Sequence, residues 1–432
     1  MFEKIVKWIF SIVFCFSFLI FFLNCTPQEK FSIEKKDGVD IVTNPDHPIP
    51  KNGFKKRIVF EEDLTIGSAK GEKNTIFSGF ISLNTDDKGY IYISDHNDLE
   101  IRKYDPNGKY LFTIGRKGQG PGEFQSVTAV RFDKDHHIFV GDVTARKILF
   151  FESEGKYLRQ TALPVAIENI YINSKGFFIA TKHEQKLQAK AMTIISVQGL
   201  LDQEFGIMAE LQKIERIIKL PGRDVNARIQ IYANMINLMV FKPSDFLTLG
   251  WDDLIYVGHP DKYEIKIYSP QGKLSKIITR DYKPVRVGKK DIENFKEEMS
   301  HHEMFQNAPE EMREKLVDLI KFPKYKPAYQ SFSLIESGMN QSFTLLKNGW
   351  LAVIADYRKD EYTVFDLFDE EGRYIAQFQT SIPVEGLFFE NGKAYAVATE
   401  EGYKCAKRFS IKLQEYIDGT WIDSKITLNI LK

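Results

Sequence analysis

The chain has 432 residues, and its 59 Lys and Arg residues are balanced by 59 Asp and Glu residues, so the formal net charge is zero. This balance gives no support for a polyanionic partner such as nucleic acid. The 34 Phe and 19 Tyr residues favour β-rich structure, because flat rings pack well on pleated surfaces.

The first 25 residues predict an export signal. Lys4 and Lys7 give a positively charged start, and residues 8–23 form an almost unbroken apolar run. The run is followed by Cys25, after which the chain becomes polar at once. A cysteine in this place resembles the bacterial lipoprotein signal, which implies cleavage before Cys25 and acylation of its thiol.

An uncleaved signal anchor is the alternative. Phe22 stands three residues before Cys25, where the lipoprotein pattern has Leu, and the apolar run is roughly long enough to span a bilayer. The lipoprotein interpretation is favoured because the cysteine sits where the pattern requires it. Both alternatives place the rest of the protein outside the cytoplasm, tethered to a membrane of the bacterial cell envelope.

Residues 26–56 are rich in Lys, Asp, Pro and Gly, which predicts a flexible tether ahead of a folded part at residues 57–432. Cys405 is the single cysteine of that folded part, so the fold has no internal disulfide and its core must stabilise it. A packed or surface thiol is favoured over a catalytic one at this position.

One pattern recurs through the folded part: a turn with Gly, Asp or His leads into a short apolar strand of alternating character. It occurs six times, beginning near Gly89, His137, Gly176, Asp253, Gly349 and Gly392. A second turn follows at hairpin spacing, most clearly at Asp105–Tyr110, and its glycine suits the positive φ of a tight turn. Units of four short antiparallel strands with a period of about 40 residues predict an all-β fold, a six-bladed β-propeller.

The N-terminal end of the folded part is expected to close the ring. Asp63–Gly67 copies the end of the fourth strand of the first unit, Leu111–Gly115, yet comes before that unit. The sixth unit lacks a clear fourth strand of its own, so residues 57–66 are predicted to supply it and to remove an exposed sheet edge. The tail at 416–432 is an alternative occupant of the same place.

The segment Tyr90–Phe124, which ends in the Gly-rich connection Ile114–Phe124, resembles NHL-type repeats and the bacterial six-bladed β-propeller lipoproteins related to them. The resemblance is strongest over the first two blades. It implies a propeller that serves as a binding surface.

Two long interruptions of the repeat, at about 207–243 and 282–329, are predicted to be helical insertions between blades. Leu211, Ile214, Ile217 and Ile218 are spaced as an apolar stripe in the first insertion. In the second, Pro309 follows a capping residue. Strand order places both insertions at one end of the ring, together with the Gly-rich connection. The helices either surround the mouth of the central channel or cover blade surface, and the sequence favours neither.

Polar residues expected at that end form the candidate ligand-binding face. They are Asp95, His96, Arg116, Lys117, Glu123, Asp142, His183 and His259. Structural turn positions are the competing interpretation for the aspartates, and a solvated turn is the competing interpretation for Arg116, Lys117 and Glu123.

Known metal and phosphate motifs are not matched, so no cofactor, metal or catalytic set is predicted. His302-Glu303 is not followed by the second histidine of a zinc helix, because Gln306 stands there. Asp133 and Asp135 lack the density of oxygen ligands of a calcium loop, and the adjacent His136 and His137 are expected to be exposed in a turn.

The sequence favours an extracytoplasmic, membrane-anchored binding or scaffold module for a protein, peptide or glycan. A metal-dependent propeller hydrolase or lyase with its site at the channel mouth is the alternative. A third possibility is a structural component of an envelope assembly.

Overall fold

The computed structural model describes most of the folded part of the chain. It covers residues 31–49, 56–77, 79–220, 225–237, 240, 246–250, 252–258, 260–301, 310–328, 343–345, 351–358, 362–379, 385–390, 392–400, 402–417 and 419–423. Cys25 and the apolar run before it lie outside these residues. Within them, no helix has both the length and the apolar character needed to cross a membrane.

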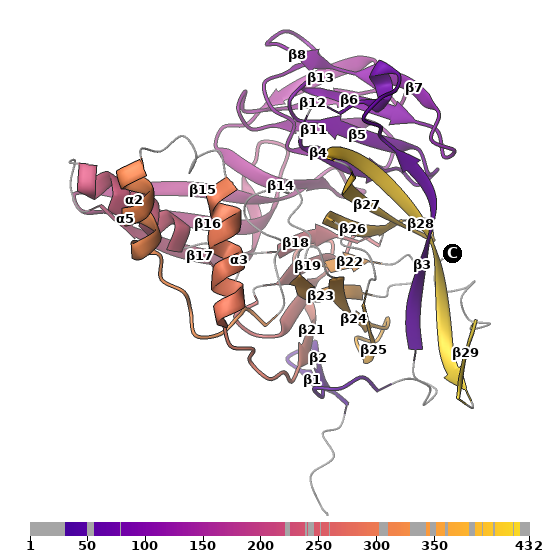
Figure 1. Ribbon diagram of the computed structural model, residues 1–432, viewed down its shortest axis with the longest axis vertical. Coiled ribbons are helices and arrows are strands. Elements are labelled where there is room, and N and C mark those ends of the chain that lie inside the picture. Colours follow the sequence, from indigo (N-terminus) through magenta and orange to yellow (C-terminus); the bar gives the residue numbers. More distant parts are fainter. Residues whose placement is uncertain are drawn as a thin grey trace, which may run out of the picture.

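The strands form antiparallel sheets that are arranged as six blades around a ring (Figure 1). Blade one contains β4 (Ile81–Thr85), β5 (Ile91–Asp95), β6 (Glu100–Tyr104) and β7 (Tyr110–Ile114). Blade two contains β10 (Ala129–Phe132), β11 (Ile138–Asp142), β12 (Lys147–Phe151) and β13 (Tyr157–Ala162). Blade three contains β14 (Ala166–Ile172), β15 (Phe178–Gln188), β16 (Ala191–Leu201) and β17 (Ile207–Lys219).

The second half of the ring follows the same order. Blade four contains β18 (Phe246–Leu249), β19 (Ile255–Gly258), β20 (Glu264–Tyr268) and β21 (Leu274–Arg280). Blade five contains β22 (Phe343–Leu345), β23 (Leu351–Arg358), β24 (Tyr362–Phe368) and β25 (Tyr374–Gln379). Blade six contains β26 (Glu385–Glu390), β27 (Lys393–Glu400), β28 (Tyr403–Ile417) and β3 (Lys56–Ile66), with β29 (Thr420–Asp423) beside β28.

Short polar side chains shape the turns within each blade. The Asp105 carboxylate accepts the backbone N–H groups of Asn107 and Lys109, both at 2.9 Å, and Gly108 adopts a φ of +82°. Asp86, Asp133, Asp202 and Asp369 cap turns in the same way. The recurrent Asp and Gly of the sequence therefore mark turns, because they supply the acceptor and the left-handed backbone that these turns need.

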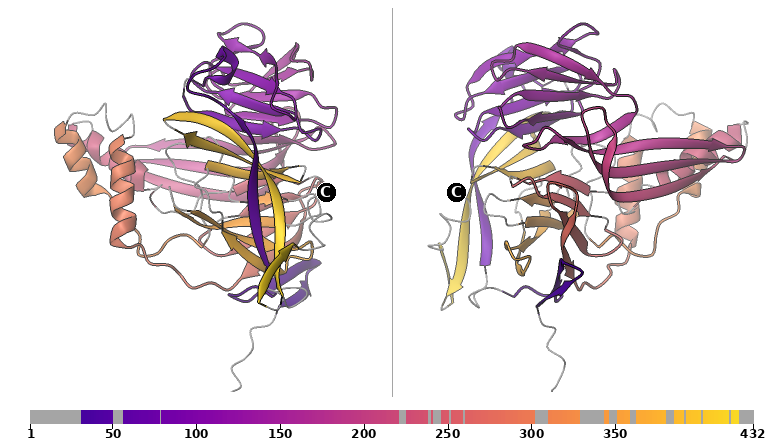
Figure 2. Two further views of the ribbon diagram at one scale, coloured as in Figure 1. Left: turned by 45° about the vertical axis from the view of Figure 1, so that its right-hand side comes forward. Right: turned by 180° about the vertical axis from the view of Figure 1, so that it is seen from behind.

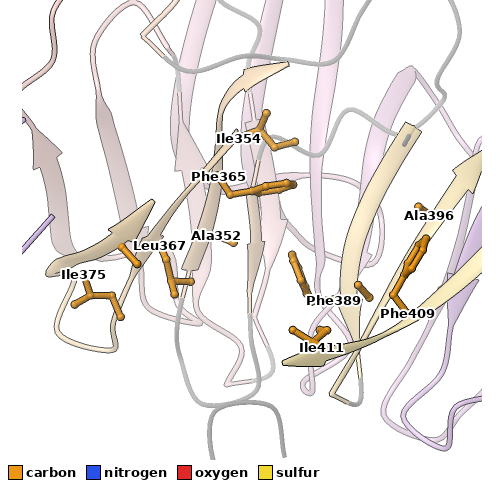
Figure 3. Close-up of a cluster of buried hydrophobic side chains, with 11 residues drawn as sticks. Ala352, Ile354, Phe365, Leu367, Ile375, Phe389, Ala396, Phe409 and Ile411 are labelled. Atoms are coloured by element: carbon orange, nitrogen blue, oxygen red, sulfur yellow. The ribbon is translucent and has the colours of Figure 1, made fainter. Parts of the chain in front are cut away.

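Apolar side chains fill each interface between neighbouring blades. In the described part of the chain, six buried clusters lie one at each blade-to-blade interface. Figure 3 shows the cluster between blades five and six, where Phe365 of β24 and Phe389 of β26 meet edge to face at 6.1 Å. One sheet cannot bury both of its faces, so stacking around the ring supplies the core.

The predicted ring closure is confirmed. β3 pairs with β28 over ten register positions, from Ile66 opposite Ala406 to Lys56 opposite Glu415. Ile66 joins the apolar cluster between blades six and one. The described part of the tail does not compete for this edge: Gln414 pairs with both β3 and β29, so these two strands lie on opposite edges of β28.

The prediction of a flexible tether at 26–56 is wrong for part of that range. β1 (Ser32–Lys36) and β2 (Val39–Asn44) form a hairpin, and β2 pairs in parallel with β21 of blade four. The turn residues Asp37 and Gly38 have φ values of +52° and +82°, as an Asp-Gly hairpin turn requires. Val42 is fully buried in the cluster between blades four and five, which explains why the hairpin stays on the ring.

A buried polar cluster lies beside this hairpin. The Asp366 carboxylate, which is fully buried, accepts hydrogen bonds from the hydroxyls of Tyr263 at 2.6 Å and Tyr374 at 2.8 Å, and it pairs with Arg280. Burial and the adjacent carboxylate raise the pKa of the Tyr263 hydroxyl well above its ordinary value. The cluster therefore joins blades four and five through a buried charge pair in their interface.

The first helical prediction, at about 207–243, is wrong over its first half. Ile207–Lys219 is β17, the outer strand of blade three, and Val225–Asn237 is the helix among the described residues of this insertion, α2. The second insertion contains α3 (Lys289–His301) and α5 (Glu310–Leu319). Ile229 and Ile236 of α2 pack with Met299 of α3 and with Leu316 and Ile320 at the end of α5. The helices thus share a small core of their own, beside the far part of β15–β17 (Figure 1).

Candidate functional site

The up-and-down order of the strands gives the ring two different ends. One end, which we call the insertion end, carries the turns after the second strands and the connections between blades, including α2, α3 and α5. The other, the turn end, carries the Asp- and Gly-capped turns within blades. Asp95, Asp142 and the Gly-rich connection lie at the insertion end, as predicted from strand order. His259 lies outside the described residues.

Asp95 and Asp142 are both fully buried, and their carboxylates accept hydrogen bonds from backbone N–H groups. Asp95 Oδ1 accepts the N–H groups of Asn97 at 3.0 Å and Asp98 at 3.1 Å. The Asp142 carboxylate accepts the N–H groups of Gln125, Ser126 and Ala145 at 2.8 to 3.1 Å. These carboxylates shape the turns after the second strands, which agrees with the structural interpretation of the aspartates.

His96 is a packed imidazole. Its Nε2 lies 3.0 Å from Ser82 Oγ, and its ring lies against Phe80 with centroids 4.7 Å apart. Burial lowers the pKa of the imidazole, although Asp95 opposes this effect, so His96 is neutral at neutral pH.

Glu123 organises the Gly-rich connection, in which β8 (Arg116–Lys117) pairs in parallel with β9 (Glu123–Phe124). Its carboxylate accepts the Gly120 N–H at 2.8 Å and pairs with Arg116 at 2.8 Å, and both interactions hold the pKa of Glu123 below its ordinary value. A Cβ on Gly118 would lie 2.1 Å from this carboxylate. Arg116 and Lys117 are exposed on the surface of a connection whose shape Glu123 fixes.

His183 lies on β15 between two polar neighbours. Its Nδ1 is 3.0 Å from Ser196 Oγ on β16, and its Nε2 is 3.2 Å from Glu168 Oε2 on β14. The hydrogen bond from His183 lowers the pKa of Glu168. The order serine, histidine, carboxylate is that of a nucleophilic triad, but Ser196 is only 3% exposed, so no acyl group reaches its hydroxyl in this conformation.

A row of buried polar side chains continues across the same sheet, and the sequence analysis missed it. Thr181, Gln198 and Gln212 are register neighbours on β15, β16 and β17. Buried polar atoms of all three have no hydrogen-bond partner in the protein, including both amide atoms of Gln198, which is 1% exposed. An unpaired buried amide is uncommon. The sequence feature that could have indicated this row is Gln198, a polar residue within the apolar run Ile195–Leu201.

Blade three extends into an arm, which we define as the distal parts of β15, β16 and β17 together with α2, α3 and α5 (Figure 2). β15 and β16 have 11 residues each and β17 has 13, whereas the four strands of blade one have five each. Leu187 on β15 is 76% exposed and Ile217 on β17 is 64% exposed. These are the two most exposed large apolar side chains of the described residues, and both lie on the arm.

The groups with metal-ligand chemistry lie elsewhere. Among the described residues, Asp133, Asp135 and His137 bring one ligand atom each within 4.8 Å of one another, at the turn end. Asp133 already accepts the N–H groups of Asp135 and His137, and its Oδ2 lies 3.0 Å from His137 Nδ1. The half-buried His137 therefore bonds to the carboxylate that caps its own turn. His136 Nδ1 lies 3.3 Å from Asp87 Oδ1 in the neighbouring blade.

Cys405 is buried against Gly67 at the ring closure. Burial raises the pKa of its thiol to about 11, so the thiolate is a minor species at neutral pH. This environment is that of a packed thiol.

Comparison with known proteins agrees with this architecture: residues 77–232 match the model of a protein family described as a 6-bladed beta-propeller. The chain is a six-bladed β-propeller, as the sequence predicts. A search of the curated proteins gives no match.

Several solved structures are similar at low sequence identity. A Bacteroides fragilis protein classed as exported is 12% identical, with a TM-score of 0.47 and coverage of 86% of this chain and 99% of that chain. A member of the DUF4221 family from Bacteroides vulgatus is 9% identical, with a TM-score of 0.41 and coverage of 82% and 99%. Virginiamycin B lyase from Staphylococcus aureus, in a complex with quinupristin, is 13% identical, with a TM-score of 0.36 and coverage of 82% and 99%.

Proposed function

We propose that this protein is a lipid-anchored, extracytoplasmic scaffold of the bacterial cell envelope whose arm docks a protein partner. The signal-like N-terminus and Cys25 support this location outside the cytoplasm and the lipid anchor. The ring supplies a rigid base, because each blade buries its faces against its neighbours.

The observation that carries this proposal is the arm. A blade needs only strands of about five residues to complete the ring, as blade one shows. The extra length of β15–β17 leaves Leu187 and Ile217 in solvent, where large apolar side chains gain nothing for the fold. Exposed apolar surface is a feature of sites that bind proteins, membranes or ligands, and Leu187 and Ile217 place such surface on a projecting element.

The chemistry of the arm fits a protein rather than a glycan. Lys186 and Lys190 lie next to Leu187, and Glu215 and Arg216 lie next to Ile217. Leu187 is in register with Met192 and Ile218, whereas Ile217 is in register with Thr193 and Lys186, so the two exposed apolar side chains lie on opposite faces of the arm. Each face then combines an apolar side chain with charged residues, as protein interfaces do. Sugar-binding surfaces need converging hydrogen-bonding groups, which these two positions do not provide.

The test compares two pairs of substitutions in cells that produce the full chain. Leu187→Asp with Ile217→Asp places charges on the arm. Leu111→Asp with Leu158→Asp is the matched control, because these leucines are 38% and 40% exposed on the outer strands β7 and β13. After in-cell cross-linking and purification from solubilised membranes, the unaltered chain and the control are expected to retain a partner at fixed ratio, and the arm variant is expected to lose it.

Equal recovery of the same partner with the arm variant and the unaltered chain contradicts the proposal. Equal melting temperatures of the two variants are required, so that loss of the partner is not loss of the fold. The hydrolase or lyase alternative is tested on the same material by metal analysis: a stoichiometric metal that is lost on substitution of His96 favours it over the scaffold.

A further inference from the structure

The distal part of β15 has a free edge. β14 pairs with β15 only as far as Ala166 opposite His183, whereas β15 continues to Gln188 before the chain turns into β16. No strand among the described residues pairs with this side of β15 beyond His183. All seven residues of Glu184–Lys190 are exposed. The edge therefore presents backbone N–H and C=O groups that another strand can satisfy.

The distal end of the opposite edge, on β17, is different because α2 lies against it. Asn234 of α2 donates a hydrogen bond from its Nδ2 to Lys219 O at 3.1 Å. At the end of the arm, the open backbone therefore lies along β15. A row of backbone donors and acceptors of this kind is recognised by an extended strand, which adds to the sheet.

The sequence of this free edge is complementary to itself. Antiparallel pairing of two copies about a two-fold axis at Leu187 uses the whole free edge of each copy, since Leu187 is its midpoint. Glu184 then stands opposite Lys190 of the second copy, and the same pair recurs on the other side of the axis. Lys186 stands opposite Gln188, so no like charges face each other directly. β14 ends before this stretch begins, so it does not occupy the place of the second copy's turn.

The same axis brings apolar side chains together. Leu187 is 76% exposed, the largest value among the large apolar side chains of the described residues. In this register it stands opposite its own copy, and Met192 is its register neighbour on β16. Two leucines and two methionines then form one apolar row across the joined sheets. Association through this edge therefore removes from water the apolar side chain that the single chain exposes most.

We propose that two copies of this chain associate through the free edge of β15, so that the distal parts of β15, β16 and β17 of both arms join into one antiparallel sheet. This inference rests on the proposed function, because it names the protein that the arm docks. Charged side chains along the edge oppose pairing in other registers, and Glu184 and Lys190 select the one in which opposite charges meet. Two chains held on one membrane by the proposed lipid anchors meet at a raised effective concentration, which favours association through a short edge.

The test measures the mass of the purified full chain in detergent by analytical ultracentrifugation over a range of concentrations. The unaltered chain is expected to show an equilibrium between monomer and dimer. Glu184→Lys and Lys190→Glu are each expected to weaken association about tenfold, because both symmetric pairs become repulsive. The variant with both substitutions is expected to restore association, since opposite charges face each other again. An equimolar mixture of the two single variants is expected to form mixed dimers for the same reason.

Ile217→Asp is the control, because Ile217 lies on the opposite face of the arm with β16 between it and the free edge. This variant is expected to associate as the unaltered chain does. Three results overturn the proposal: a monomer at every concentration, unchanged association in both single charge variants, or no restoration in the double variant. If the double variant does not fold, the mixture of single variants decides.

The cross-linking experiment on the arm separates the two proposals. A monomeric chain that still retains a different protein through its arm overturns the inference about β15 and leaves the scaffold function standing. A chain that retains neither a second copy nor any other protein overturns both.

Discussion

At the scale of single residues, Asp63 on β3 shows how one carboxylate ties the ring closure. Its Oδ1 accepts from Arg408 Nε at 2.6 Å, and its Oδ2 accepts from Ser410 Oγ at 2.7 Å and from Lys393 Nζ at 2.5 Å. Burial favours the neutral acid, but these three donors outweigh it and hold the pKa of Asp63 below the ordinary value of 3.8. A lowered folded pKa means that the ionised form stabilises the fold above the unfolded value.

We therefore expect Asp63→Asn to lower the free energy of unfolding at neutral pH by on the order of 1 kcal/mol, since solvent screens this partly exposed group. The difference from the unaltered chain should shrink as the pH falls through 3.8 toward the lowered folded pKa, because the carboxyl then becomes neutral in both states. Denaturant unfolding at neutral pH and below pH 3.8 measures this difference in the free energy of unfolding. Glu61→Gln is the control, because Glu61 lies on the same strand as Asp63 and its exposed pair with Lys412 of β28 contributes little. A loss of stability in Asp63→Asn that does not depend on pH would contradict the role assigned to the Asp63 carboxylate.

The sequence indicated the types of residue at the insertion end but not what their side chains contact. Asp95 and Asp142 follow second strands whether they cap a turn or face a ligand, and only the folded backbone shows which N–H groups they accept.

At the scale of elements, β3 completes blade six from the opposite end of the chain. Its pairing with β28 ties the N-terminal part of the folded chain to the last blade and covers the edge of β28, in addition to the apolar packing of blade six against blade one. Ile66 and Phe77 add apolar contact across the same seam.

We expect a chain that begins at Ser68 to unfold several degrees below one that begins at Lys56. Both lack the N-terminal hairpin, so the comparison isolates β3 and its pairing with β28. Thermal unfolding followed by circular dichroism measures the difference. Equal melting temperatures for the two chains would show that β3 is not what closes the ring.

Two elements were assigned wrongly from the sequence, each for a physical reason. Leu211, Ile214 and Ile218 in β17 have helical spacing because a register shift at Leu211 takes that residue out of the period-two pattern that Ile214 and Ile218 follow. The hairpin of β1 and β2 lies in a stretch rich in polar residues, yet its Asp37-Gly38 pair is a strong hairpin signal. The four-strand units were predictable because their turn chemistry repeats in every blade.

At the scale of the whole molecule, the proposed lipid anchor depends on Cys25. We expect Cys25→Ser to release the protein from the membrane fraction or to leave it at its uncleaved mass, and to abolish incorporation of an alkyne-labelled fatty acid. Cell fractionation and in-gel fluorescence measure the two effects. Labelling that persists without Cys25 contradicts the lipoprotein signal, and membrane retention at the uncleaved mass without labelling of the unaltered chain supports the signal anchor.

The N-terminal hairpin also decides which part of the ring would bear a force applied through the proposed anchor. Tension applied ahead of Ser32 meets β1 and β2 first, and β2 is bonded along its length to β21 in blade four. Asn44 adds hydrogen bonds to Thr279 O at 3.0 Å and Gly372 O at 2.9 Å. The force would therefore act first on blades four and five. It would reach the pairing of β3 with β28 only after β2 had separated from β21.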